Sequence, residues 1–145
     1  MQTVNSILIV DDNNSDVFIT SYYLQETGKV EHIWSASDGE EALKHFEEHV
    51  AGMVDDLGYF PPTAVILDIN MPRMNGFDFV DEIAKLDYIE TLPLLIVMLS
   101  SSHQDRDIAK AEANPLIADY FFKPFGDEHI ERLWALLDIE ANGSN

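Results

Sequence analysis

The sequence predicts an α/β fold in which helices cover both faces of a doubly wound, five-stranded parallel sheet. Short apolar segments alternate five times with segments whose apolar residues recur at helical spacing, which is typical of strand–helix repeats. Three of the apolar segments, 6–10, 64–67 and 94–99, are continuous, as expected of strands buried on both faces. We expect the strand order 2-1-3-4-5, a common order in doubly wound sheets.

Each expected helix follows a strand and is marked by apolar residues three or four positions apart. In the first helix Phe18 and Tyr22 show this spacing, and Gly28 ends the helix. The fourth helix has the weakest pattern, and Pro115 must end it. We therefore expect strands at 6–10, 32–36, 64–67, 94–99 and 120–122, and helices at 15–27, 38–50, 76–84, 103–113 and 130–137.

The length and the composition of the chain limit the classes of protein to which it can belong. The 145 residues fit one domain, so we expect a single unit over 1–145 with no second, output-type domain. The formal net charge is -19 and the few basic residues are scattered, which argues against direct binding of nucleic acid. No run approaches the roughly 18 apolar residues that a membrane-spanning helix needs. The chain has no cysteine, which suits a cytoplasmic location.

Polar residues follow four of the expected strands at the point where each strand ends. Asp11 and Asp12 follow the first strand, Asp68 the third, Ser100 the fourth and Lys123 the fifth. Because the carboxyl ends of parallel strands share one edge, and strands 1, 3, 4 and 5 are neighbours in the expected order, these side chains should meet in one crevice.

The residue types in this crevice indicate phosphoryl chemistry. Three carboxylates repel one another, and a hard divalent cation such as Mg²⁺ relieves that repulsion. The metal, the ammonium of Lys123 and the hydroxyl of Ser100 would together cradle a phosphoryl group. Asp68 and the serines are the candidate nucleophiles, and we favour Asp68 because no histidine is placed to activate a serine.

Each of these residues also has a plainer interpretation. Asp11 and Asp12 can cap a helix, Asp68 can be a turn residue, and Lys123 can be merely solvated. Tyr120, three residues before Lys123, can be an ordinary core residue. Their coincidence at one sheet edge favours a functional site.

With these residues in place, the chain resembles the receiver domain of two-component response regulators, the CheY-like family. The resemblance covers about residues 6–140. The matching segments are Asp11-Asp12 after the first strand, Asp68 before Ile-Asn-Met-Pro and Asn-Gly, Ser100 at the end of the fourth strand, and Lys123-Pro124-Phe125.

The resemblance implies a role for each matching position. Asp68 would be the phosphoacceptor, and Asp11, Asp12 and the backbone carbonyl of Asn70 would complete the Mg²⁺ site with it. Ser100 and Tyr120 would form the switch pair that responds to the phosphoryl group. Lys123 would pair with the phosphate, and the bond between Lys123 and Pro124 would be cis.

The chain departs from the family pattern in several places. Ser101 stands where a small alanine is usual, and Asn70 and Ser102 occupy positions that the family varies to set the lifetime of the phosphoryl group. The segment 50–62 is longer than the usual link, and the helix before Pro115 is poor.

The expected function is therefore that of a stand-alone phosphoreceiver, which is not an enzyme beyond its own phosphorylation and dephosphorylation. A histidine kinase or phosphotransfer protein would donate the phosphoryl group. The resulting change in conformation would be recognised by a downstream protein, or by a second copy of the chain that binds through helix 4, strand 5 and helix 5. A degenerate receiver that binds partners without phosphorylation is the first alternative. The second alternative is a phosphatase with an aspartate nucleophile, although such enzymes require an acidic residue at the position where this chain has Asn70.

Overall fold

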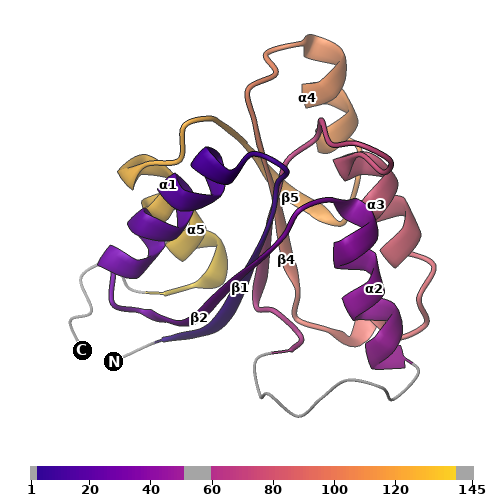
Figure 1. The fold of residues 1–145 in the computed structure, drawn as a ribbon, viewed down its shortest axis with the longest axis horizontal. Helices are drawn as coiled ribbons and strands as arrows, with labels where there is room; N and C mark the ends of the chain where they lie inside the picture. Colours follow the sequence, from indigo (N-terminus) through magenta and orange to yellow (C-terminus); the bar gives the residue numbers. More distant parts are fainter. Residues whose placement is uncertain (1–2, 51–59, 140–145) are drawn as a thin grey trace.

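A computed structural model describes residues 3–50 and 60–139, apart from the side chains of 49 and 50. Its centre is a five-stranded parallel sheet in the order β2-β1-β3-β4-β5, which confirms the predicted doubly wound fold (Figure 1). The strands are β1 (Val4–Val10), β2 (Val30–Ala36), β3 (Ala64–Leu67), β4 (Leu95–Ser100) and β5 (Ile117–Phe122). The helices are α1 (Asn14–Glu26), α2 (Gly39–Val50), α3 (Gly76–Ile83), the 3₁₀ turn η1 (Ile89–Thr91), α4 (Asp105–Glu112) and α5 (Asp127–Leu137).

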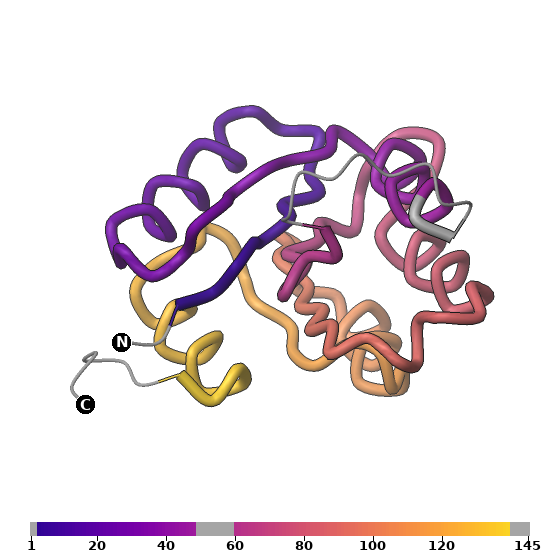
Figure 2. Tube along the Cα trace, turned by 90° about the horizontal axis from the view of Figure 1, so that it is seen from below, coloured from indigo at the N-terminus to yellow at the C-terminus, as the bar shows by residue number. Residues whose placement is uncertain are grey.

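The helices cover the two faces of the sheet in two groups. Helices α1 and α5 lie on one side, and α2, α3 and α4 lie on the other (Figure 1); the view turned by 90° shows the same division (Figure 2). Successive residues of the central strands point to opposite faces, so each continuous apolar strand supplies both cores. In β1, for example, Leu8 and Val10 join the core under α2 and α3, whereas Ile7 and Ile9 join the core under α1 and α5.

Local sequence signals set the helix ends. The side chain of Asn13 accepts a hydrogen bond from the Asp16 N–H and caps α1, and Gly28 follows the helix with a positive φ of 67°. Asn75 and Asp78 form a reciprocal capping box at the start of α3. Helix α4, whose pattern in the sequence is weak, is present but is only eight residues long.

Several elements begin two or three residues before the predicted position, among them β1 at Val4 and α5 at Asp127. Strand β2 begins at Val30 and β5 at Ile117, two and three residues earlier than predicted. In α1 the predicted spacing is correct, but Phe18 and Tyr22 face solvent and Leu24 faces the core. Most of the predicted long link at 50–62 lies outside the described residues. No helix in the described ranges is both long and apolar enough to cross a membrane.

Candidate functional site

The carboxyl ends of β1 and β3 bring two acidic residues side by side. Asp11 follows β1 directly and Asp68 follows β3 directly. The backbone N–H of Asp68 donates to the Val10 carbonyl at 2.9 Å, so the strand pairing itself sets the spacing of the two acids. This junction is also where the strand order reverses, which is the usual ligand position in open α/β sheets.

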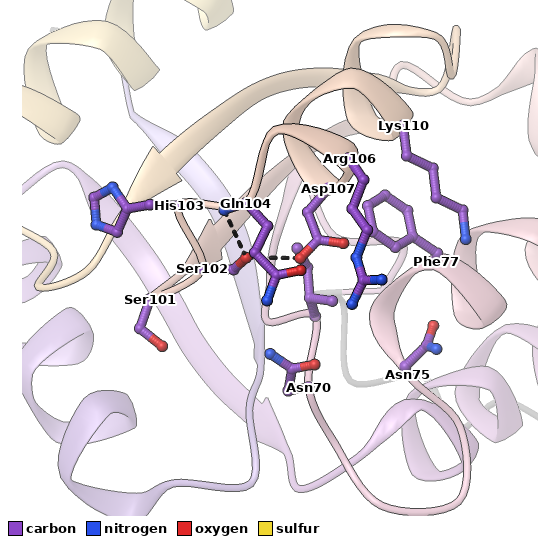
Figure 3. A pocket seen from close by; sticks show the side chains of 11 residues that line it. Asn70, Asn75, Phe77, Ser101, Ser102, His103, Gln104, Arg106, Asp107 and Lys110 are labelled. Carbon is purple, nitrogen blue, oxygen red and sulfur yellow. Dashed lines mark hydrogen bonds between the residues drawn. The ribbon is translucent and has the colours of Figure 1, made fainter.

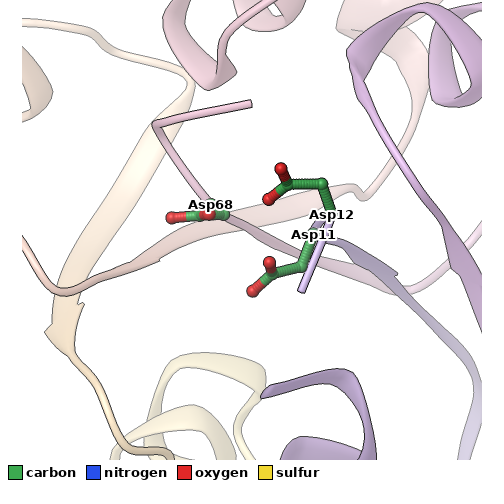
Figure 4. Close-up of side chains that lie close together, drawn as sticks. All are labelled: Asp11, Asp12 and Asp68. Carbon is green, nitrogen blue, oxygen red and sulfur yellow. The ribbon is translucent and has the colours of Figure 1, made fainter. Parts of the chain in front are cut away.

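Three carboxylates converge at this junction, as Figure 4 shows. Oxygen atoms of Asp11, Asp12 and Asp68 all lie within 4.8 Å of one another. Asp11 and Asp68 are buried, whereas Asp12 is exposed. Carboxylate oxygens at this spacing, open to water on one side, fit the ligand preference of Mg²⁺. The residues predicted from the sequence therefore form a cluster that can hold a metal ion.

Lys123 carries the positive charge of the crevice. Its Nζ lies 2.8 Å from Oδ2 of Asp11, 2.7 Å from Oδ2 of Asp16 and 3.5 Å from Oδ2 of Asp68. Burial alone would lower the pKa of Lys123, but the hydrogen bonds to Asp11 and Asp16 and the charge of Asp68 raise it above 10.5. The ammonium is thus a permanent charge, held by two acids and placed beside the third.

The carboxyl group of Asp68 is less easily ionised than an ordinary aspartate. Burial and the nearby charge of Asp11 raise its pKa from 3.8 to about 6, although Lys123 and the backbone N–H of Ile69 oppose the shift. The Ile69 N–H donates to Oδ1 of Asp68 at 2.8 Å, which leaves Oδ2 as the oxygen nearest to Lys123. A cation that binds at this carboxylate would relieve the repulsion that raises the pKa.

We expect the Asp68→Asn variant to be more stable than the wild type in the absence of metal. Because the pKa of Asp68 is about 6 in the folded protein and 3.8 as its ordinary value, the native state binds the extra proton between these values. The wild type therefore loses stability as pH rises from about 4 to 6, and the full penalty applies above pH 6. Since Asp68 keeps some contact with water, the gain should be about 1–2 kcal/mol at pH 8 and should vanish at pH 4.

Urea denaturation in EDTA at both pH values measures this gain. The exposed Asp87→Asn substitution is the matched control, because it removes the same charge far from the crevice. An equal effect of both substitutions would show that net charge, rather than the site, causes the change.

The loop after Asp68 is held at two points. Gly76 donates its N–H to the Ile69 carbonyl at 2.8 Å, and a Cβ on Gly76 would lie only 2.3 Å from the Asp68 carbonyl oxygen. Arg73 has a positive φ of 66° and bonds to the carboxylates of Asp38 and Glu40 at the start of α2. Contacts from both α2 and α3 therefore fix the backbone that presents Asp68.

The residues at the end of β4 form a second hydrogen-bonded group. Ser100 is fully buried, and its Oγ accepts from the backbone N–H of Ser102 at 3.1 Å. The hydroxyl of Tyr120 in β5 donates to the Ser102 carbonyl at 2.9 Å, while its ring packs against the core. Ser100 and Tyr120 are thus both linked to Ser102, which joins the two predicted switch residues through one loop.

The structure brings Asp11, Asp12, Asp68 and Lys123 together, with Ser100 on the adjoining strand. The Lys123–Pro124 peptide bond is cis. The backbone carbonyl of Asn70 follows the same strand end, and its role as a metal ligand stays a prediction.

Sequence reasoning missed Asp16, which binds Lys123 although 107 positions separate the two residues. The available signal was an acidic residue in the first turn of a helix that starts beside the crevice. It also missed a cavity beside Asp68 that is lined by Arg106 and Lys110, two cations four positions apart on α4.

Comparison with known proteins agrees with this geometry. Residues 7–134 match the response regulator receiver domain family. The probable methanogenesis regulatory protein FilR2 of Methanothrix harundinacea is 28% identical over 87% of this chain and 76% of its own length. The transcriptional regulatory protein HptR of Staphylococcus aureus is 34% identical over 68% of this chain, which spans only 32% of HptR.

A solved structure gives the same result for the fold. A two-component response regulator from Cytophaga hutchinsonii superimposes with a TM-score of 0.79 at 29% identity, and the match covers 94% of this chain and 98% of that one. Receiver domains are signalling modules that typically bind Mg²⁺ and interact with kinases or phosphotransfer proteins, and the three-carboxylate cluster fits that description. The chain belongs to the response regulator receiver domain family.

Proposed function

We propose that the chain is a phosphoreceiver that accepts a phosphoryl group on Asp68 and signals through contact with another protein. The observation that carries this proposal is the position of the Asp68 carboxylate, within 4.8 Å of two further carboxylates and 3.5 Å from a buried ammonium. This combination both keeps a carboxylate available as a nucleophile and neutralises the charge of an incoming phosphoryl group.

Each residue of the crevice has a separate role in the proposed phosphoryl transfer. Asp68 attacks phosphorus through Oδ2, because its Oδ1 is occupied by the Ile69 N–H. Bound Mg²⁺, held by Asp11, Asp12, Asp68 and the carbonyl of Asn70, would neutralise phosphoryl charge. Lys123 supplies a second positive charge that its own acids hold in place. Asp68 donates no proton in this step, so no general base is required.

Phosphorylation then shifts the equilibrium between two conformations of the residues at the carboxyl end of β4. The hydroxyl of Ser100 turns from the Ser102 N–H toward the phosphoryl oxygen, and the Tyr120–Ser102 contact responds. Such a response is a shift between existing conformations. The surface formed by α4, β5 and α5 carries the change to a downstream protein or to a second copy of the chain.

The proposed donor is a histidine kinase or a histidine phosphotransfer protein. Such donors draw their phosphoryl group from ATP, so we place the reaction in the cytoplasm. The chain itself acts as a signalling module and not as an enzyme with an external product.

The direct test is incubation with acetyl phosphate and Mg²⁺ followed by mass spectrometry of the intact protein. The wild type and the Asp87→Asn control should both gain one phosphoryl mass, and Asp68→Asn should gain none. EDTA should abolish the gain, because the three carboxylates then lack the charge that attracts the donor. Equal labelling of Asp68→Asn and wild type would refute the assignment of the phosphoacceptor.

A further inference from the structure

A polar cavity of about 650 Å³ lies directly beside the proposed phosphoacceptor (Figure 3). Its lining includes Ile69 and Asn70, the two residues that follow Asp68, and Ser101 and Ser102, which follow Ser100 on the neighbouring strand. The volume is in the range of small-molecule sites in proteins. A ligand in this cavity would therefore contact the loop that follows Asp68 directly.

Two cations of α4 line the cavity. Arg106 and Lys110 are four positions apart, and Figure 3 shows the Arg106 side chain extending toward the space above Asn70 and Asn75, with Lys110 beside Phe77. Within the described ranges neither forms an ion pair, although the chain carries 27 acidic residues. The Nζ of Lys110 lies 4.6 Å from the centre of the Phe77 ring, a cation–π contact that holds the amine at the wall.

The other polar groups of the cavity leave these cations available. Asp107 also lines the cavity, but its Oδ2 accepts a hydrogen bond from Ser102 Oγ at 2.6 Å. The Oδ1 of Asn75 accepts from the Asp78 N–H, so its remaining hydrogen-bonding group is the donor NH₂. With two cations and one anion, the lining has a net positive charge in a protein whose total charge is -19.

The charges on the two sides of Asp68 are opposite in sign. On the β1 side Asp11 and Asp12 repel any second carboxylate. On the β4 side the cavity offers Arg106 and Lys110. Besides Lys123, which faces the phosphoryl site itself, the cavity is therefore the positively charged side for an anionic group that approaches or leaves Asp68.

We propose that this cavity is the subsite for the carboxylate leaving group of acyl-phosphate donors, an inference that rests on the proposed phosphorylation of Asp68. In the transfer, an oxygen of Asp68 forms a bond to phosphorus as the bond from phosphorus to the acyl oxygen breaks. The electron pair of the broken bond stays on the donor, which departs as a carboxylate. Arg106 and Lys110 stabilise that developing charge. Among small-molecule donors, the subsite favours those whose leaving group is an anion.

The test compares two phosphodonors with different leaving groups. Acetyl phosphate releases a carboxylate, whereas phosphoramidate releases neutral ammonia. The double variant Arg106→Gln/Lys110→Gln should react with acetyl phosphate about 10- to 100-fold more slowly than the wild type, while its reaction with phosphoramidate should stay within about twofold. The difference should shrink at high salt, because both cations are exposed and therefore screened.

The matched control is Lys44→Gln/Lys85→Gln, which removes the same two charges outside the cavity and should react with both donors as the wild type does. The charge-preserving Arg106→Lys/Lys110→Arg variant should recover most of the rate with acetyl phosphate. Unchanged reaction of the double variant with acetyl phosphate, or equal slowing with both donors, would overturn the subsite and leave phosphorylation of Asp68 intact. Failure of the wild type to react with either donor would instead refute the proposed function, and with it the subsite.

Discussion

The Lys123→Gln variant should be less stable than the wild type by about 2–4 kcal/mol at pH 8 in the absence of metal, because it leaves acids of the crevice without their counterion. The side chain of Lys123 is only 12% exposed, and that of Asp11 only 3%. Asp68, whose pKa is already raised to about 6, would lose its nearest positive charge. Urea denaturation followed by circular dichroism measures the free energy of unfolding.

The loss should depend on pH and on Mg²⁺. Near pH 4 Asp68, whose pKa is raised to about 6, is protonated, so the difference in stability between the two proteins should become smaller. Mg²⁺ should stabilise the variant more than the wild type, because the metal replaces part of the missing charge. Phosphorylation of Asp68 should nevertheless remain severely impaired, since the ammonium lies where phosphoryl charge must be neutralised.

Arg132→Gln provides the comparison for this variant. Arg132 is 55% exposed and bonds Asp119 at 2.6 Å, so its loss should cost no more than about 1 kcal/mol. If Lys123→Gln were as mild as Arg132→Gln, the lysine would not be the charge that holds the acidic crevice together.

The second large effect is expected for Gly76→Ala. The added Cβ would lie 2.3 Å from the carbonyl oxygen of Asp68 and 3.1 Å from the Cα of Ile69. Both neighbours are backbone atoms of the strand end, so the strain cannot be relieved by a side-chain rotation. We expect a loss of about 2–3 kcal/mol in stability. Phosphorylation of Asp68 should slow by more than about tenfold, because the residue that moves is the proposed phosphoacceptor itself.

Gly126→Ala controls for the addition of a methyl group. Gly126 has an extended φ of -157°, and a Cβ there would approach nothing closer than Glu128 Oε1 at 3.5 Å. This substitution should change stability by less than about 1 kcal/mol and should leave phosphorylation unchanged. A similar result for both glycines would exclude close approach at Asp68 as the cause.

The fold was predictable where a strand is buried on both faces. Strand β3 was predicted at Ala64–Leu67, as observed, because nothing interrupts its apolar run. Strands β1, β2 and β5 were predicted too short, because polar residues interrupt their apolar runs, as Asn5 does in β1 and Glu31 does in β2. Asp119 interrupts the apolar pattern of β5, and β2 extends back to Val30 through its pairing with Val4. Strand pairing, which depends on the neighbouring strand, set these boundaries.

The site was predictable only as far as topology determines it. Asp11, Asp12 and Asp68 had to meet because they end neighbouring strands. The contact between Asp16 and Lys123 depends on how α1 crosses the sheet, which no local pattern records. The same limit applies to α1 itself, because helical spacing identifies the helix but does not say that Phe18 would face solvent.

The two tight hydrogen bonds of Lys123 have a consequence for the proposed binding of a phosphoryl group. An ammonium has three protons, and Asp11 and Asp16 take two of them at 2.8 and 2.7 Å. The remaining separation, 3.5 Å to Asp68, is too long for a good hydrogen bond. A phosphoryl oxygen can therefore use the third proton without displacing an existing partner. Fixing the lysine side chain costs about 2 kcal/mol of conformational entropy. That cost is met when the chain folds and need not be met again when a phosphoryl group binds.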